Sequence, residues 1–256
     1  MSQQLPAKFG LPLTSRQIEK NIHLADKAAD LAPYAIMCNN AYARDIPIPL
    51  PEGWTENENL RRPRVEPSKK SGRMVGLALA VFEKRENHKL VEVVVAFRGT
   101  DGLSDWIQNL IPFFRNQVEP ARQAFEKILL EYAGQPVKVT DTGHSLGGGL
   151  AFHMSFAYPH IDAIAFNASP VTKAGQEVDM SNKRTSVWES GEALQAVRNT
   201  VNWSRQRWRG VERIEFRFLH GFTIKQHLME DFALNLTKLG ATRSSTLRAL
   251  TDSWRI

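Results

Sequence analysis

Hydrophobic and polar positions follow two different patterns along the chain. From residue 76 onward, short apolar runs rich in valine, alanine and leucine alternate with segments of helical spacing. Buried strands that alternate with helices are typical of a mostly parallel central sheet covered by helices on both faces. The predicted strands are Gly76–Glu83, Leu90–Phe97, Val137–Thr140, Ile161–Phe166, Thr185–Trp188 and Arg213–Leu219. The predicted helices between and after them are Glu119–Ala133, Leu146–Tyr158, Glu192–Arg198 and His227–Leu239, so the pattern indicates the α/β class.

The first 75 residues carry a helical pattern followed by a polar stretch. Thr14 and Gln17 form a capping-box pattern, which predicts a helix over Ile18–Asp30. Pro33 is expected to break or restart the helix, and a second helix is predicted at about residues 34–43. The proline-rich stretch Asp45–Ser71 is predicted to be a long surface loop, and Lys84–Lys89 the turn between the first two strands.

We therefore expect one domain over residues 1–256. Residues 1–75 would form an N-terminal helical wrap, 76–240 the core and 241–256 a basic tail. In that tail, Arg243–Ile256 has the spacing of a short amphipathic helix on a surface.

The segment around Ser145 carries the strongest chemical signal. Gly143, Ser145 and Gly147 form a Gly-x-Ser-x-Gly pattern between a predicted strand and a predicted helix. This context is that of a nucleophile elbow, in which a strained turn lifts the serine and leaves no room for side chains two positions away. We therefore expect an α/β-hydrolase fold with Ser145 as nucleophile, and we interpret the adjacent His144 as a packing residue.

A second motif makes a resemblance specific. Phe97-Arg98-Gly99-Thr100, then Asp105-Trp106 and Asn109-Leu110, precede Gly143-His144-Ser145-Leu146-Gly147-Gly148. The pair resembles the class 3 lipase family, clearly over residues 90–155 and more weakly to residue 240. The resemblance implies an oxyanion hole from Thr100 and Leu146 and a lid over Leu103–Leu110. It also implies that Trp106 faces the acyl site or a membrane, although plain core packing explains this residue equally well.

A nucleophilic serine needs a base and an orienting acid. In this fold the chain order is serine, acid, histidine, so the base lies late in the chain. His227, at the start of the last predicted helix, is favoured over His220, which ends the preceding strand.

The acid departs from the family's pattern, because the usual aspartate is absent. Glu192 aligns best with it, Glu189 at the strand end is the alternative, and Asp179 lies in a looser segment. Glu192 could also simply favour the N-terminus of its own helix.

These features predict a serine hydrolase that cleaves carboxylic esters of lipids, of the lipase or phospholipase A type, through an acyl-enzyme. One alternative is an esterase or thioesterase for small substrates. Another is a catalytically weak lipid-binding protein that keeps the fold, for which the missing aspartate is the argument. We expect no cofactor and no metal site, because no phosphate loop, dinucleotide fingerprint or metal-ligand spacing occurs.

Charge and targeting signals add expectations about partners. The net charge is +6, and Trp203–Arg209 interleaves tryptophan with arginine. Such residues suit peripheral contact with an anionic membrane, although a merely solvated basic face explains them equally well; we expect no nucleic-acid partner. The sole cysteine, Cys38, and the absence of a signal pattern in residues 1–10 predict a protein that is cytoplasmic when made. Export without a cleaved signal stays open, and a protein inhibitor would be a partner if the chain is a secreted toxin.

Overall fold

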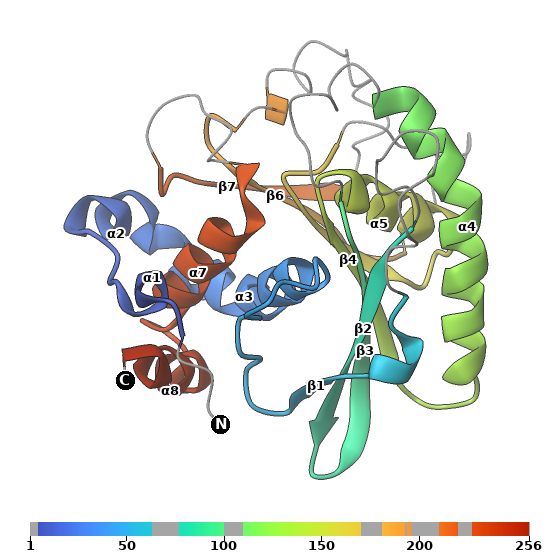
Figure 1. The fold of residues 1–256 in the computed structure, drawn as a ribbon, viewed down its shortest axis with the longest axis horizontal. Helices are drawn as coiled ribbons and strands as arrows, with labels where there is room; N and C mark the ends of the chain where they lie inside the picture. Colours follow the sequence, from blue (N-terminus) through green and yellow to red (C-terminus); the bar gives the residue numbers. More distant parts are fainter. Residues whose placement is uncertain are drawn as a thin grey trace.

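A seven-stranded sheet, in which the spatial order of the strands is their order in the chain, forms the centre of the molecule (Figure 1). This computed structural model describes residues 5–62, 77–99, 110–169, 181–192, 194–195, 210–219 and 227–255. The strands are β1 (Trp54–Glu56), β2 (Leu79–Glu86), β3 (Lys89–Phe97), β4 (Lys138–His144), β5 (Asp162–Phe166), β6 (Arg184–Glu189) and β7 (Val211–Phe216). The pairs β1–β2 and β2–β3 are antiparallel, and all pairs from β3 to β7 are parallel.

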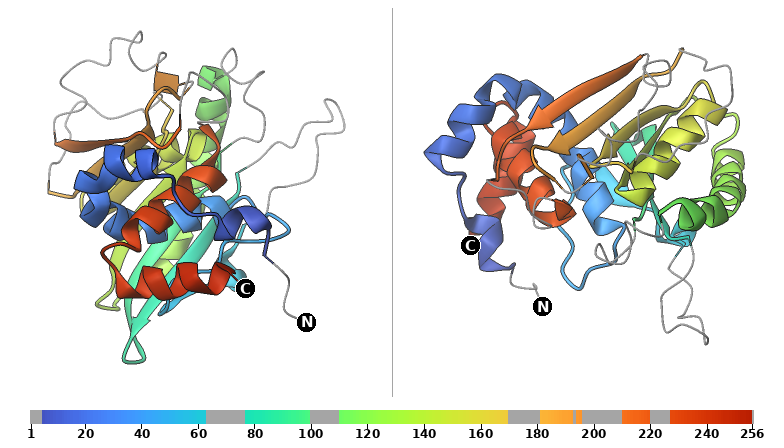
Figure 2. Two further views of the ribbon diagram at one scale, coloured as in Figure 1. Left: turned by 90° about the vertical axis from the view of Figure 1, so that its left-hand side faces the viewer. Right: turned by 90° about the horizontal axis from the view of Figure 1, so that it is seen from above.

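The one-way strand order decides which helices cover which face. Crossovers between parallel strands are right-handed, so connections that all step in one direction place their helices on one face. Helices α4 (Leu110–Glu131) and α5 (Leu146–Ala157) are the crossovers from β3 to β4 and from β4 to β5, and both lie on the same face (Figures 1 and 2). Phe125 of α4 and Leu150 and Met154 of α5 pack there against Val95 and Phe97 of β3.

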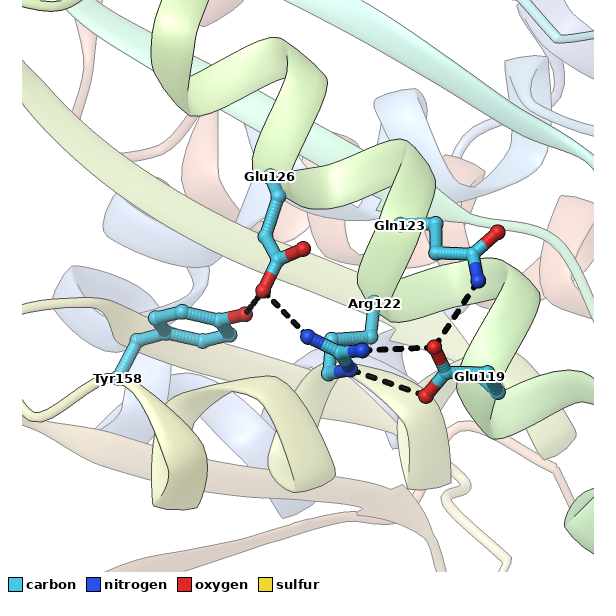
Figure 3. A network of polar contacts seen from close by, with 5 residues as sticks. All are labelled: Glu119, Arg122, Gln123, Glu126 and Tyr158. Atoms are coloured by element: carbon cyan, nitrogen blue, oxygen red, sulfur yellow. Dashed lines mark hydrogen bonds and ion pairs between the residues drawn. The ribbon is translucent and has the colours of Figure 1, made fainter.

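A polar network reinforces the contact between these two helices (Figure 3). Arg122 of α4 donates to Glu119 at 2.6 Å and to Glu126 at 2.6 Å on the same helix. The Tyr158 hydroxyl, just after α5, donates to Glu126 at 2.8 Å. The Tyr158 ring also lies 5.3 Å from that of Phe125, so α4 is held to the end of α5 by both polar and aromatic contacts.

The opposite face is covered by helices from the two ends of the chain. These are α1 (Ala7–Gly10), α2 (Ser15–Asn21), α3 (Ala25–Asn40), α7 (Met229–Gly240) and α8 (Ser245–Asp252), with short 3₁₀ turns at Ile22–Leu24 and Ser253–Arg255. A further 3₁₀ turn, Glu58–Leu60, contributes Leu60 to the cluster of α4 and α5. Figure 1 shows α3 and α7 side by side against the sheet. Ile36 of α3, Phe166 of β5 and Phe232 of α7 share one buried cluster. Cys38 of α3 and Thr142 of β4 meet at 3.1 Å between their side-chain sulfur and oxygen atoms.

The structure confirms the predicted alternation of strands and helices in the core. It corrects the helices predicted in the N-terminal region. The capping box at Thr14 and Gln17 is formed, but it begins only the short α2, and a turn separates α2 from α3. Pro33 neither breaks nor restarts a helix, because α3 runs through it. Buried residues on both sides of it, Leu31 and Ile36, continue one apolar face, and this packing offsets the one lost backbone hydrogen bond.

Two predicted loops contain more structure than expected. The stretch Asp45–Ser71 includes β1 and a 3₁₀ turn; residues 63–71 lie outside the described part. The predicted turn Lys84–Lys89 is mostly strand, because β2 and β3 are joined by Asn87 and His88 alone, at φ 49° and 66°. Two residues with positive φ form the tight hairpin turn whose twist matches that of the strands.

Helix and strand ends differ elsewhere by amounts that local patterns do not resolve. Helix α4 begins nine residues before the predicted Glu119, at Leu110, and β7 lies two to three residues before its predicted place. Helix α8 forms in the basic tail as predicted, but its apolar side is buried: Leu247 is 2% exposed, and Trp254 of the 3₁₀ turn that follows is 4% exposed. The rings of Trp254 and Phe9 lie 5.7 Å apart, so this side of the helix packs on the molecule and is not offered to a surface.

Candidate active site

Ser145 stands between β4 and α5 with an unusual backbone. Its φ and ψ are 59° and −121°, a combination that costs a non-glycine residue free energy and is found where the surroundings enforce it. The Ser145 amide donates to Phe166 O at 3.0 Å, and the Ser145 carbonyl accepts from Ser169 N at 2.9 Å. Both bonds anchor the turn to the end of β5, so the strained conformation is held from the side.

The glycines around Ser145 are required by close packing. A Cβ atom at Gly147 would lie 2.0 Å from Phe97 O, and one at Gly143 would lie 2.3 Å from the backbone of Gly147. Side chains at these positions would force the strand and the helix apart. Together with the parallel sheet and its two helical layers, this elbow confirms the predicted α/β-hydrolase fold.

His227 and Glu192 are brought together from distant parts of the chain. His227 Nδ1 lies 2.9 Å from Glu192 Oε2, and both side chains are buried, at 5% and 0% exposure. The same Oε2 accepts from Leu194 N at 2.8 Å. The Glu192 carboxylate therefore contacts both the backbone amide of Leu194 and the ring of His227.

Glu189 has another partner, although it lies three positions away. Its Oε1 accepts from Leu219 N at 2.9 Å, at the end of β7, and no hydrogen bond to His227 is recorded within the described residues. Burial raises the pKa of Glu189 to about 8, against the opposing effect of the backbone amides of Leu219 and Phe218. A carboxyl group with this pKa is mostly protonated at neutral pH, which suits a structural bond better than the stabilisation of a charged histidine.

His144, interpreted from the sequence as a packing residue, lies between Tyr42 and His227. The Tyr42 hydroxyl is 2.8 Å from His144 Nδ1, and the His144 and His227 rings are 4.6 Å apart between centroids. Since His144 directly precedes Ser145, this contact places His227 beside the elbow. The contact of Tyr42 with His144 was missed from the sequence, where no motif marks Tyr42 and 102 positions separate the two residues.

The remaining predicted site residues are placed only in part. Leu146 is buried and opens α5, so its amide is one of the first helical amides, which have no partner inside the helix. Outside the described residues lie Thr100, Leu103–Asn109 with Trp106, Asp179, Trp203–Arg209 and His220. Leu110, the last residue of the predicted lid, is the first of α4.

The described residues contain no group of three or more His, Cys, Asp or Glu side chains arranged to hold a metal ion. Among the same residues, no helix has the length and apolar character needed to cross a bilayer.

Comparison with solved structures finds α/β enzymes of low similarity. A putative dienelactone hydrolase from Klebsiella pneumoniae matches with 12% identity and a TM-score of 0.40, covering 76% of this chain and 98% of that one. Thermogutta terrifontis esterase 2 matches with 16% identity and a TM-score of 0.39, covering 73% and 93%. An esterase from Pyrobaculum calidifontis matches with 12% identity and a TM-score of 0.38, covering 91% and 99%.

Comparison at the level of sequence families is more specific. No curated protein sequence matches the chain. The model of the Tle-like phospholipase domain, described as phospholipase-like, matches residues 33–200, which is more than half of the chain and includes Tyr42, Ser145 and Glu192. Membership of the class 3 lipases stays a prediction. What the family match establishes is that the chain belongs to the family of Tle-like phospholipase domains.

Proposed function

We propose that this chain is a serine hydrolase that cleaves carboxylic ester bonds of phospholipids, with Ser145, His227 and Glu192 as its catalytic residues. The observation that carries the proposal is the strained elbow of Ser145 beside the buried pair of His227 and Glu192. The phospholipase-like family supports the choice of a phospholipid over other esters.

In the proposed mechanism, Ser145 Oγ attacks the ester carbonyl while His227 Nε2 takes the hydroxyl proton. Glu192 accepts a hydrogen bond from Nδ1–H and stabilises the imidazolium that forms. The backbone amides of Leu146 and Thr100 are proposed to hold the oxyanion. His227 then returns its proton to the departing alcohol, and water hydrolyses the acyl-enzyme by the same steps, which restores the free serine.

The position of Glu192 bears on the alternative of a catalytically weak lipid-binding protein. That alternative depended on the missing aspartate. A glutamate carboxylate 2.9 Å from the histidine can do the same work, so the substitution by itself gives no reason to expect lost activity. An esterase or thioesterase for small substrates would use the same catalytic residues. Only the substrates that the enzyme turns over distinguish it from a phospholipase.

Ester hydrolysis by the purified protein tests the proposal directly. We expect turnover of phospholipid vesicles, and we expect Ser145→Ala to lower it at least about 10³-fold, because the mutant lacks the nucleophile. Ser245→Ala, an exposed serine of α8, is the matched control and should keep full activity. Turnover of a short soluble ester alone would replace the phospholipase proposal by an esterase. No turnover and no labelling by a fluorophosphonate would reject the serine hydrolase.

The net charge of +6 leads to a prediction about the membrane surface. We propose that the basic surface concentrates the enzyme on anionic bilayers, an attraction that salt screens over about 10 Å at 0.1 M. Activity on anionic vesicles should therefore fall as salt rises from about 0.05 to 0.5 M, while activity on a soluble ester stays constant. Equal activity on anionic and zwitterionic vesicles at every salt concentration would contradict this.

A further inference from the structure

Three aromatic side chains from separate parts of the chain are in contact with one another beside the elbow. Tyr42 follows α3, His144 ends β4 and His227 precedes α7. The Tyr42 hydroxyl forms a hydrogen bond of 2.8 Å with His144 Nδ1, and the two rings are tilted with centroids 6.0 Å apart. The His144 ring then lies against that of His227, with centroids 4.6 Å apart and planes 47° apart. The order of contacts is Tyr42, His144, His227, Glu192.

Tyr42 is itself held firmly. The guanidinium groups of Arg98 and Arg44 lie over its ring, 5.2 and 5.5 Å from the centroid. Its hydroxyl lies against Gly99, where a Cβ atom would come within 2.5 Å of the phenol oxygen. The position of this hydroxyl is therefore set by the loop after β3 as well as by α3, and the hydroxyl can act as a fixed anchor.

His144 offers His227 a neutral surface. Its pKa lies well below the usual range, chiefly because the ring is buried and also because of charge at His227, although the backbone carbonyl of His227 acts in the opposite direction. A neutral ring packs against an imidazolium without the repulsion that a second positive charge would bring.

One hydrogen bond does not fix the orientation of an imidazole ring. The bond from His227 Nδ1 to Glu192 fixes the position of one ring atom. The contact with the His144 ring, whose plane is tilted by 47°, adds a constraint on the plane of the His227 ring and so on where Nε2 points. Misplacement of a reacting group by about 1 Å can lower a rate about 10²-fold, so such a contact has a measurable effect.

We infer that Tyr42 and His144 are positioning residues, in which Tyr42 fixes the His144 ring and that ring keeps His227 aligned with Glu192 for proton transfer from Ser145. This inference rests on the proposed function, because it concerns the same three catalytic residues. It assigns no contact with substrate to either residue.

Replacement of Tyr42 tests whether its hydroxyl fixes the His144 ring. We expect Tyr42→Phe, which removes one oxygen and keeps the ring beneath the two arginines, to lower kcat about tenfold and to change KM less than twofold. Tyr34→Phe is the matched control: it is a tyrosine of the same helix region whose hydroxyl donates to Glu92 at 2.9 Å, and it should leave both constants unchanged.

A double-mutant cycle tests whether Tyr42 acts through His144. His144→Phe keeps an aromatic face for His227 and loses the nitrogen that Tyr42 contacts. In that background, Tyr42→Phe should have no further effect on kcat. Multiplication of the two effects would mean that Tyr42 acts on its own and would overturn the inference. His144→Ala should lower kcat several-fold more than His144→Phe, because only the phenylalanine restores the ring contact.

A spectroscopic readout separates this inference from the proposed function. In the inactive Ser145→Ala protein, the proton between His227 Nδ1 and Glu192 can be followed by NMR without any turnover. Its exchange with water should be about tenfold faster with Tyr42→Phe or His144→Phe added, and unchanged with Tyr34→Phe. Unchanged exchange in the first two proteins would overturn the inference, even if the enzyme hydrolyses esters. Faster exchange in a protein that hydrolyses no ester would reject the proposed function and leave the positioning intact.

Discussion

At the scale of single residues, two glutamates that lie three positions apart have different hydrogen-bond partners, and we expect different roles for them. Glu192 contacts His227, and Glu189 contacts the backbone of Leu219. A glutamine in place of either keeps an oxygen that can accept the same backbone hydrogen bond, so the two substitutions differ chiefly in what they do to the histidine.

We therefore expect Glu192→Gln to lower kcat about 10³- to 10⁴-fold, because the amide cannot stabilise the imidazolium and favours the wrong tautomer. Glu189→Gln is the matched control and should change kcat less than about tenfold. Steady-state kinetics on one soluble ester measures both. A larger loss for Glu189→Gln would transfer the role of the acid to that residue.

Site residues could be predicted from the sequence where they lie close together along the chain and form one local structure. Gly143, Ser145 and Gly147 form one turn, so their spacing alone indicated the elbow. The choice between Glu189 and Glu192 stayed open, because spacing along a chain does not tell which of two nearby carboxylates faces a histidine 35 positions later. Tyr42 was missed for the same reason, since its partner lies on another element.

At the scale of elements, the elbow depends on how closely α5 approaches β3. Gly147 is the point of contact, since the space for its Cβ is already occupied by the Phe97 carbonyl. Gly134, after α4, is a useful contrast: its φ is 78°, but nothing lies within 4 Å of where a Cβ would be.

We expect Gly147→Ala to lower the free energy of unfolding by about 3 kcal/mol and to abolish activity, because the helix must move away from the strand. Gly134→Ala should cost only about 1 kcal/mol, from backbone strain alone, and should keep activity. Chemical denaturation and an ester assay on both variants check this. Equal losses in the two would mean that close packing at the elbow is not the cause.

Element types were predictable where a short apolar run or a motif marked them. The apolar runs of β3 and β5 indicated strands, and the elbow motif indicated the helix after Ser145. Pro33 was misinterpreted because its local cost was visible in the sequence, whereas the compensating contact between α3 and α7 was not. The edge strand β1 was missed because three residues in a proline-rich stretch carry too short a pattern.

At the scale of the whole molecule, one buried carboxyl group links stability to pH. Asp141 lies in β4, is fully buried, and neither of its carboxyl oxygens has a hydrogen-bond partner among the described residues. Burial raises its pKa well above the usual value. The folded protein therefore keeps this proton at a pH where the unfolded chain, with a pKa near 4, has lost it.

The sign of the effect follows from this difference. The folded state loses stability relative to the unfolded state as pH rises from about 4 toward the raised pKa, and below about pH 4 the group contributes no pH dependence. Asp141→Asn should thus be more stable than the wild type by about 1–3 kcal/mol at pH 8, with the difference shrinking toward pH 4. Urea denaturation at several pH values measures it. A difference that does not change with pH would contradict the raised pKa.

The sequential order of the strands has a consequence for how the chain reaches its folded state. Each strand pairs with the one before it, so the sheet can grow by accretion from the β2–β3 hairpin, and each step closes only the connection between consecutive strands. Helix α3 is the exception, because it precedes the sheet in the chain and its partner α7 follows it. Met37 of α3 can pack on β2 and β3 early. The part of α3 that packs with α7, which includes Ile36, waits until the polypeptide is nearly complete, and during synthesis on the ribosome this surface needs protection from aggregation.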